Sequence, residues 1–285
     1  MVTLINKNNK NIVTLKNIKT KFQSHPFHIV DNSPWPILIS WTLFFMAIGA
    51  VLSMQGFTIG SNLLLLGFIT TVSVMFFWFG DINTEGSILG NHTKEVKKGL
   101  TIGFFLFVIS EVMAFFTVFW AAGHSALAPA VEIVSWPPLG INALDPFSIP
   151  LLNTFLLLSS GAFITYGHHS FIGGKRKDAI ISIFITIVLA VVFTLFQFFE
   201  YSNSGFSISD GIFGTIFYCS TGLHGLHVII GTIFIWVSFV RQLSYYISRQ
   251  GHVGLETAIV YWHFVDIVWL FLYVTIYVWG SSLSN

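Results

Sequence analysis

The stretch FLFVISEVMAFF, residues 105–116, places one carboxylate, Glu111, inside an otherwise apolar run. Such a run belongs either to the core of a soluble protein or to a membrane span, and the composition of the whole chain separates the two. Of 285 residues, 54% are hydrophobic and 9% are charged, whereas soluble domains carry roughly a quarter charged residues. Because so few charges cannot cover a soluble surface, the sequence predicts an integral membrane protein, and no nucleic-acid partner is expected.

Apolar runs long enough to cross a bilayer, which takes about 20 residues, recur seven times. We predict an all-α membrane protein with transmembrane helices at about 35–55, 61–79, 99–122, 150–172, 179–200, 211–240 and 256–280. The longest connection, about 123–149, is too short and Pro-rich for a further soluble domain. Residues 1–24 are expected to form a basic, poorly ordered tail, and residues 25–285 a single seven-helix domain.

The positive charges agree with this topology. All 13 Lys and Arg residues lie in the N-terminal tail or in the second, fourth and sixth connections, and the alternate connections contain none. By the positive-inside rule, the N-terminus is expected inside and the C-terminus outside, which requires an odd number of spans. A single cysteine, Cys219, excludes an intrachain disulfide and a cysteine-based metal cluster.

Several ionisable side chains fall deep within these spans, where such residues mark functional sites or polar contacts between helices. Besides Glu111, they are His168, His224, His227, His263 and Asp266. The histidines could ligate a metal or haem, line a proton path, or form structural hydrogen bonds, and the third interpretation is favoured. We expect Glu111 to be neutral, because hydrocarbon disfavours its charged form. A structural or lipid hydrogen bond is favoured for it over a proton-linked role.

At these residues the sequence resembles the subunit III family of cytochrome c oxidase, the haem–copper terminal oxidase of respiration. The motifs that carry the resemblance are HPFHIVDNSPWP (25–36), ISEVMAFF (109–116), HSALAP (124–129), WPPLGI (136–141), PLLNT (150–154), FTLFQFFEY (193–201), ISDGIFG (208–214), TGLHGLHVIIG (221–231) and YWHFVDIVWLFLYVTIYVWG (261–280). They occur in order over residues 25 to 281, nearly the whole chain.

The resemblance implies a seven-helix fold in which a V-shaped cleft, holding phospholipid, separates the first two helices from the other five. It also implies a subunit without haem, copper or another metal and without catalytic residues, since the redox centres belong to subunits I and II. The expected role is to stabilise subunit I and support proton uptake within complex IV, which oxidises cytochrome c, reduces oxygen and pumps protons. Further small subunits, membrane lipids and a respiratory supercomplex are expected partners. The expected location is the mitochondrial inner membrane, with the N-terminus in the matrix and the C-terminus in the intermembrane space.

Position by position, the resemblance makes Glu111 the intramembrane carboxylate of the family. It implies lipid-binding roles for four further residues: Trp78, Glu85, His92 and Arg241. The segment WFGDINTEGS departs from the family, because Gly80 and Thr84 stand where arginines are usual. This departure removes a candidate phosphate clamp.

Two alternatives of other classes remain from the residues alone. One is a free-standing membrane cytochrome that uses His224, His227 and His263 as ligands. The other is an independent transporter, although the chain has no internal repeat of the kind found in inverted-repeat transporters. Both alternatives predict activity or a bound cofactor in the isolated chain.

Overall fold

The computed structural model describes residues 25–129, 135–248 and 251–281, so the predicted tail at 1–24 lies outside the described residues. The elements, in chain order, are α2 (Trp35–Met54), α3 (Thr58–Asn83), η1 (Thr84–Leu89), α4 (Lys94–Leu127), α5 (Ile149–Ile172), α6 (Arg176–Asn203), α7 (Gly211–Leu243), α8 (Val253–Leu272) and η2 (Tyr273–Val278). Within this part of the chain, seven helices are long and apolar enough to cross a membrane, and each covers one predicted span. The seven-helix, all-α prediction is therefore confirmed.

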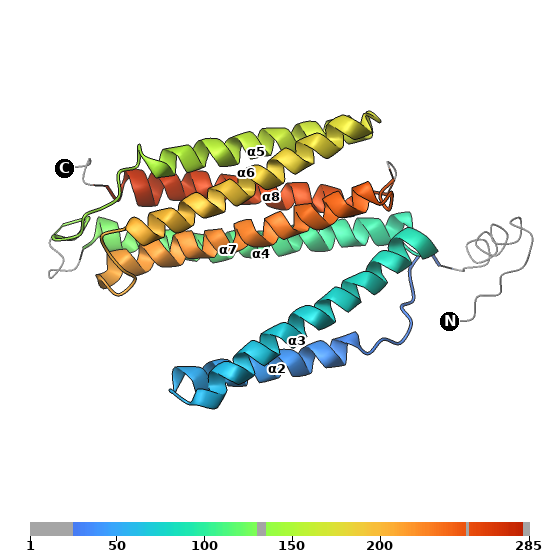
Figure 1. Cartoon of the computed structure of the whole chain (residues 1–285), viewed down its shortest axis with the longest axis horizontal. Helices are drawn as coiled ribbons and strands as arrows, with labels where there is room; N and C mark the ends of the chain where they lie inside the picture. The colour runs from blue at the N-terminus through green and yellow to red at the C-terminus, as the bar shows by residue number, and fades with distance from the viewer. Residues whose placement is uncertain (1–24, 130–134, 249–250, 282–285) are drawn as a thin grey trace, which may run out of the picture. The chain divides into compact units, whose positions relative to one another are not determined.

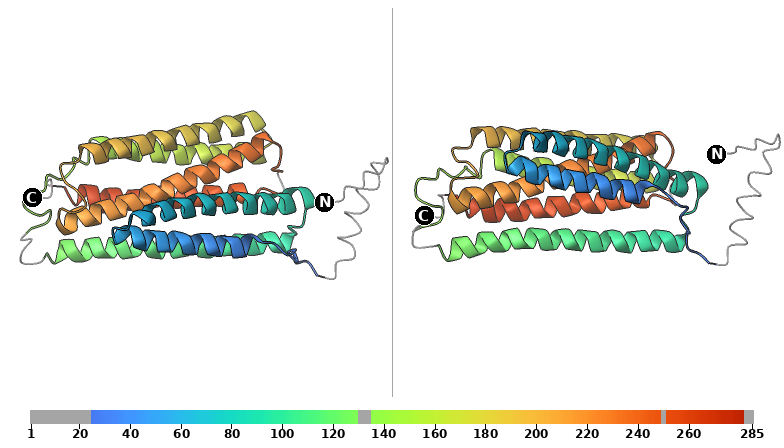
Figure 2. Two further views of the ribbon diagram at one scale, coloured as in Figure 1. Left: turned by 60° about the horizontal axis from the view of Figure 1, so that its bottom comes forward. Right: turned by 90° about the horizontal axis from the view of Figure 1, so that it is seen from below.

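The described chain forms two compact units, and the boundary between them falls inside α4, after Leu100. The first unit contains the hairpin of α2 and α3, which lie side by side in Figures 1 and 2. Glycines bring these two backbones together. A Cβ on Gly49 would lie 2.5 Å from the backbone N of Leu64, and one on Gly67 would lie 2.9 Å from the Cα of Met46. Small residues of this kind let transmembrane helices pack closely without a hydrophobic driving force.

The core of the second unit lies among α5, α6, α7 and α8 (Figure 1). Two fully buried tryptophans of α8 donate hydrogen bonds to hydroxyl groups on α5. Trp262 Nε1 lies 2.9 Å from Ser160 Oγ, and Trp269 Nε1 lies 3.0 Å from Thr154 Oγ1. Because no water competes for these groups within a bilayer, such bonds hold the helices in one register and rotation.

α4 packs in the second unit through long aromatic side chains. Four of its ring contacts are Phe104 with Phe234, Phe107 with Tyr261, Phe115 with Phe264 and Phe119 with Phe271, at ring-centroid distances of 6.3, 6.3, 5.9 and 6.1 Å. Phe234 lies on α7, and the other three partner rings lie on α8. An aromatic seam, made of these four ring pairs, therefore lines the side of α4 that faces α7 and α8. Glu111 lies within this seam.

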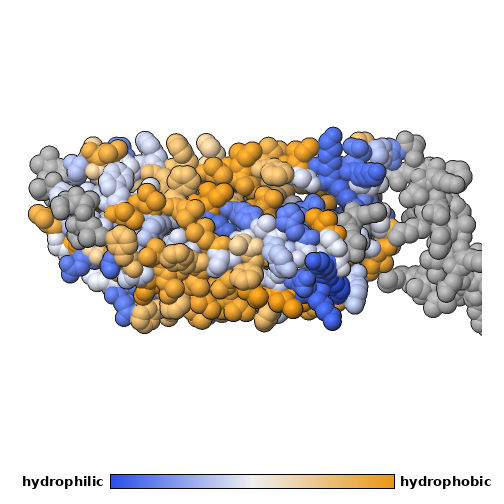
Figure 3. All heavy atoms as spheres, turned by 90° about the horizontal axis from the view of Figure 1, so that it is seen from above, coloured by the Kyte–Doolittle hydropathy of each residue, from blue (hydrophilic) through white to orange (hydrophobic). Residues whose placement is uncertain are grey.

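The ends of the helices agree with the topology expected from the charges. Arg176, at the start of α6, donates from Nη2 to the carbonyl oxygens of Gln242 and Leu243, at 2.7 and 3.0 Å. The fourth and sixth connections, both basic, therefore lie at the same end of the second unit. Seen from the side of α5 and α6, hydrophobic residues predominate in the middle of the surface, where a hydrophilic patch interrupts them, and further hydrophilic residues lie toward the ends (Figure 3).

Candidate functional site

The carboxylate of Glu111 on α4 meets the imidazole of His227 on α7. Glu111 Oε2 lies 2.9 Å from His227 Nε2, and the two side chains are 24% and 7% exposed. The residues are separated by 116 positions in the sequence. The sequence predicted a structural or lipid hydrogen bond for Glu111, and in the structure its hydrogen-bond partner is a side chain of the same protein.

The second nitrogen of His227 defines how the pair can share protons. His227 Nδ1 lies 2.7 Å from the carbonyl oxygen of Leu223. Because a carbonyl oxygen can only accept, Nδ1 carries a hydrogen, which leaves Nε2 to interact with Glu111. Either a neutral Glu111 donates to Nε2, or an imidazolium donates to a carboxylate. In both forms, the pair holds one shared proton and has no net charge, which suits its position in an apolar seam.

Aromatic rings enclose this pair. The ring of Phe115 lies edge-on to His227 at 5.0 Å between centroids, and the ring of Tyr261 stacks on it at 6.1 Å with 16° between planes. Phe115 is buried at 2% exposure. Because such surroundings have a low dielectric constant, they strengthen a satisfied hydrogen bond and raise the cost of breaking it.

His224, one turn before His227, has a different environment. Its side chain is 1% exposed, and Nε2 donates to the carbonyl oxygen of Val265 on α8 at 3.2 Å. Its ring lies against Phe193 and Trp269, at 5.8 and 5.1 Å. The predicted pair of histidines on one helix face is thus present, but each ring contacts a different neighbouring helix.

His263 and Asp266 link α8 to α5. His263 Nε2 lies 3.0 Å from Thr165 Oγ1, and its Nδ1 lies 3.6 Å from Asp266 Oδ2. Asp266 is 6% exposed, and a Cβ on Gly161 would come within 2.5 Å of Asp266 Oδ2. Gly161 therefore makes room on α5 for the carboxylate of Asp266.

His168, at the end of α5, belongs to a further cluster that the sequence did not predict. Its neighbours are His252, at 5.6 Å between ring centroids, and Glu256, whose Oε1 lies 3.0 Å from His252 Nε2. One ligand atom from each of the three residues falls within 4.8 Å of the others. The His252 and Glu256 spacing of four residues was the available signal, because it places both on one helical face.

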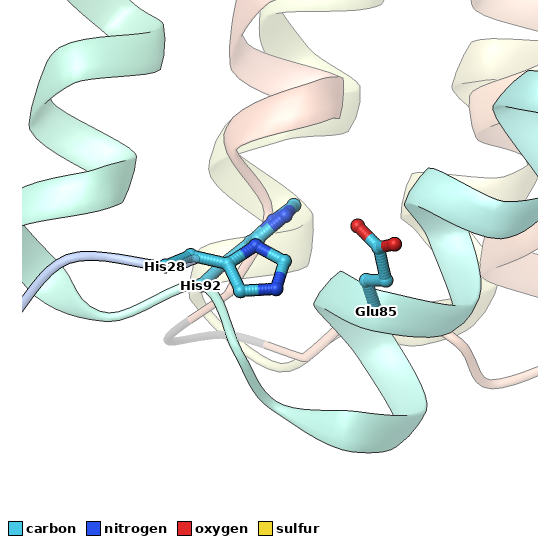
Figure 4. Close-up of side chains that lie close together, drawn as sticks. All are labelled: His28, Glu85 and His92. Carbon is cyan, nitrogen blue, oxygen red and sulfur yellow. The ribbon is translucent and has the colours of Figure 1, made fainter. Parts of the chain in front are cut away.

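The residues assigned to lipid through the family resemblance fall in both units. Glu85 on η1 and His92, just before α4, come together in the first unit, and His28 joins them (Figure 4). Trp78 is half-buried on α3 of the same unit, while Arg241 lies in the last turn of α7 in the second. His28 was not predicted, because it lies outside every span and 57 residues before Glu85.

Another buried carboxyl, Glu200, lies near the end of α6. It is 3% exposed, and its Oε1 accepts hydrogen bonds from Tyr277 Oη at 2.7 Å and Gln197 Nε2 at 3.2 Å. From the sequence, a glutamate near the end of a span is expected to reach the water at the membrane surface. The structure instead buries it against Tyr277 of η2, 77 residues further along the chain, a contact that no local pattern indicates.

The alternative hypothesis of a free-standing cytochrome needs His224, His227 and His263 as ligands of one group, but each of these rings contacts different partners. Among the described residues, the two His/Glu groups close enough to share a metal ion contain none of His224, His227 and His263. Each of these rings contacts a protein acceptor or hydroxyl instead, as given above. The geometry therefore does not favour a ligand set built from them. The individual roles predicted for the site residues stay predictions.

Known proteins resemble this chain over nearly its full length. The sequence model of the family described as cytochrome c oxidase subunit III matches residues 25–281. The cytochrome c oxidase subunit 3 of Schizophyllum commune is 57% identical over 262 residues, which cover 92% of this chain and 98% of the relative. That of Podospora anserina is 54% identical over 265 residues, covering 93% and 98%. That of Rhizopus stolonifer is 50% identical over 282 residues, covering 99% and 100%. The resemblance inferred from the motifs is confirmed: the chain belongs to the cytochrome c oxidase subunit III family.

Proposed function

We propose that this chain, a non-catalytic subunit of cytochrome c oxidase and a multi-pass mitochondrial membrane protein, braces the haem-bearing subunit I of the complex. The observation that carries the proposal is the Glu111–His227 pair, a net-neutral contact in which the two buried ionisable side chains of α4 and α7 bind each other. Membership of the family implies assembly with the other subunits. Subunit I as the direct neighbour, with subunit II also in the complex, is part of the proposal.

The chain itself is proposed to hold no haem or copper, and to bind phospholipid. Within the first unit, His92 and Glu85 supply polar groups beside the apolar surface of α3, and in the second unit Arg241 offers a cation that suits a phosphate. The orientation proposed from the basic connections puts the N-terminus in the matrix and the C-terminus in the intermembrane space, across the inner membrane. The contact between Arg176 and the end of α7 supports this orientation, because it brings two basic connections to one end.

A structural role and a proton-linked role of Glu111 predict different results. In the purified oxidase, Glu111→Gln keeps a side chain that can donate to His227 Nε2, so a structural role predicts normal assembly, haem content and oxygen consumption. Collapse of electron transfer in this variant would contradict the proposal. A proton-linked role instead predicts normal initial electron transfer with slowed or decaying proton uptake. Glu200→Gln is the matched control, since it alters another buried carboxyl that has no histidine partner in the described chain.

The proposal also separates this chain from a free-standing cytochrome or transporter. Mild-detergent purification through a tag on this chain is expected to bring down a haem-bearing partner. Metal analysis and an optical spectrum of the chain, once freed from that partner, are expected to show no haem. A haem that stays with the isolated chain would overturn the assignment of the redox centres to other subunits.

A further inference from the structure

Two histidines and a glutamate converge in the first unit, outside the apolar part of any helix. They are His28, in the segment before α2, Glu85 on the π-helical turn η1, and His92 in the link to α4. One ligand atom from each lies within 4.8 Å of the other two, and all three side chains are half-buried. Figure 4 shows the two imidazole rings next to each other, with the Glu85 carboxylate on their side of η1. The ring centroids of His28 and His92 are 6.1 Å apart.

Contacts around the cluster hold these three segments together. Thr93 Oγ1 donates to the carbonyl oxygen of Pro26 at 2.5 Å, and the side-chain amide of Asn91 lies 3.3 Å from His28 Nε2. The segment before α2 is thus attached to the link before α4 at two points. A metal-binding histidine donates its second ring N–H to an acceptor, and the Asn91 side chain supplies one when its amide oxygen is turned toward His28 Nε2.

A glycine lets the ring of His92 approach the π-helical turn. A Cβ added to Gly86 would lie 2.6 Å from His92 Nδ1 and 2.9 Å from its Cε1, which is closer than side-chain atoms tolerate. The imidazole therefore lies directly on the backbone that carries Glu85. Any larger residue at Gly86 would displace one ligand relative to another while leaving all three ligands in the sequence.

From this geometry we infer that His28, Glu85 and His92 form a binding site for a divalent transition-metal ion, of which Zn²⁺ fits best. Two imidazoles and one carboxylate are a ligand set that zinc accepts, at bonds of about 2.0–2.2 Å. The fourth tetrahedral position is left to water or to a phosphate oxygen of the phospholipid proposed beside Glu85 and His92, so the two roles are compatible. Ligands bound in this way lie about 3.4 Å from one another. The observed limit of 4.8 Å therefore requires only side-chain rotations of these half-buried residues. Ca²⁺ and Mg²⁺ are disfavoured, because they prefer oxygen ligands.

The cluster of His168, His252 and Glu256 is a weaker candidate for a metal site. There, the Glu256 carboxylate is already 3.0 Å from His252 Nε2, and the side chain of Glu256 is 46% exposed. That cluster belongs to the second unit, so it provides an internal reference. Any zinc bound there is unchanged by substitutions in the first unit.

The test uses the intact oxidase, purified with this chain in place. Wild-type and variant complexes are treated with a chelator, dialysed against micromolar Zn²⁺, and analysed for zinc per haem by mass spectrometry. His28→Gln, Glu85→Gln and His92→Gln are each expected to lose one zinc equivalent, or to bind it at least about tenfold more weakly. His25→Gln is the matched control, because His25 lies in the same segment but outside the cluster, and it should keep the full complement. Equal zinc content in all five complexes would overturn the inference.

Two further measurements test the site even if a ligand variant fails to assemble into the oxidase. Gly86→Ala retains all three ligands, and it is expected to weaken zinc binding by displacing the His92 ring. In the unaltered complex, Zn²⁺ is expected to protect His28 and His92, but not His25, from acylation by diethylpyrocarbonate, read residue by residue by mass spectrometry. Equal modification of His28 and His92 with and without zinc would contradict the site, whatever the variants do.

Discussion

Separating Glu111 from His227 is expected to weaken the attachment of α4 to α7 by an amount that can be bounded. The bond of 2.9 Å joins an acid and an imidazole in an aromatic seam. In water-soluble proteins, a hydrogen bond involving a charged group contributes about 1.5–3 kcal/mol. Double-mutant cycles within a membrane protein average about 0.6 kcal/mol and reach about 1.7, because the unfolded chain in the bilayer also finds partners. The coupling between Glu111 and His227 is therefore expected to be about 1 kcal/mol.

Three single substitutions at this pair differ in what they leave behind. Glu111→Ala removes the partner of Nε2, and His227→Ala also removes the ring that packs on Phe115 and Tyr261. The histidine substitution is therefore expected to cost more than the glutamate substitution. Glu111→Gln should cost less than either, under about 1 kcal/mol, because the amide can still donate to Nε2.

The assay is the free energy of unfolding in mixed micelles, titrated with a denaturing detergent and followed by tryptophan fluorescence. It is measured for both single alanine variants, their double variant and Glu111→Gln. A coupling of about 1 kcal/mol corresponds to a roughly fivefold change in the unfolding equilibrium constant. Strict additivity of the two single variants would refute the pair as a stabilising contact. Loss in Glu111→Gln equal to that in Glu111→Ala would refute the reasoning that a donor to Nε2 is what the site requires.

Three further predictions concern helix packing and are measured in the same unfolding assay. Gly49→Ala is expected to destabilise the α2–α3 hairpin by about 1–3 kcal/mol, since its Cβ would meet a backbone atom at 2.5 Å. The control is Gly80→Ala on α3, where a Cβ meets nothing within 4 Å, and it should be neutral or stabilise by up to about 1 kcal/mol. Equal losses of stability in both variants would refute the close approach of the two helices. Trp262→Phe removes the bond of 2.9 Å to Ser160 and should cost about 0.5–1.5 kcal/mol; an unchanged stability would mean that the bond contributes nothing net. Tyr277→Phe deprives the buried carboxyl group of Glu200 of the closer of its two donors, at 2.7 Å, and should cost about 1–3 kcal/mol. A gain in stability would show that the hydroxyl is the poorly satisfied group.

The polar network at each site depends on pairs that are far apart in the sequence. His227 is 116 residues from Glu111, and Thr165 is 98 residues from His263. In a membrane helix, apolar residues occur on every side, so the hydrophobic pattern does not mark which face packs on a neighbour. For this reason, the sequence could place Glu111 at depth but could not name its partner, and it missed the convergence of His28 with Glu85 and His92.

The sequence by itself determined the number of spans, their order and the shared end of the fourth and sixth connections, which are both basic. Hydropathy and charge act residue by residue along the chain, because whether a segment spans a bilayer depends on the summed transfer free energies of its own residues. Only the tertiary structure decided which polar groups meet, since that depends on the rotation of each helix about its own axis. That rotation is fixed by contacts such as Trp262 on Ser160 and by the close approach of helices at glycines, which act between segments and not within them.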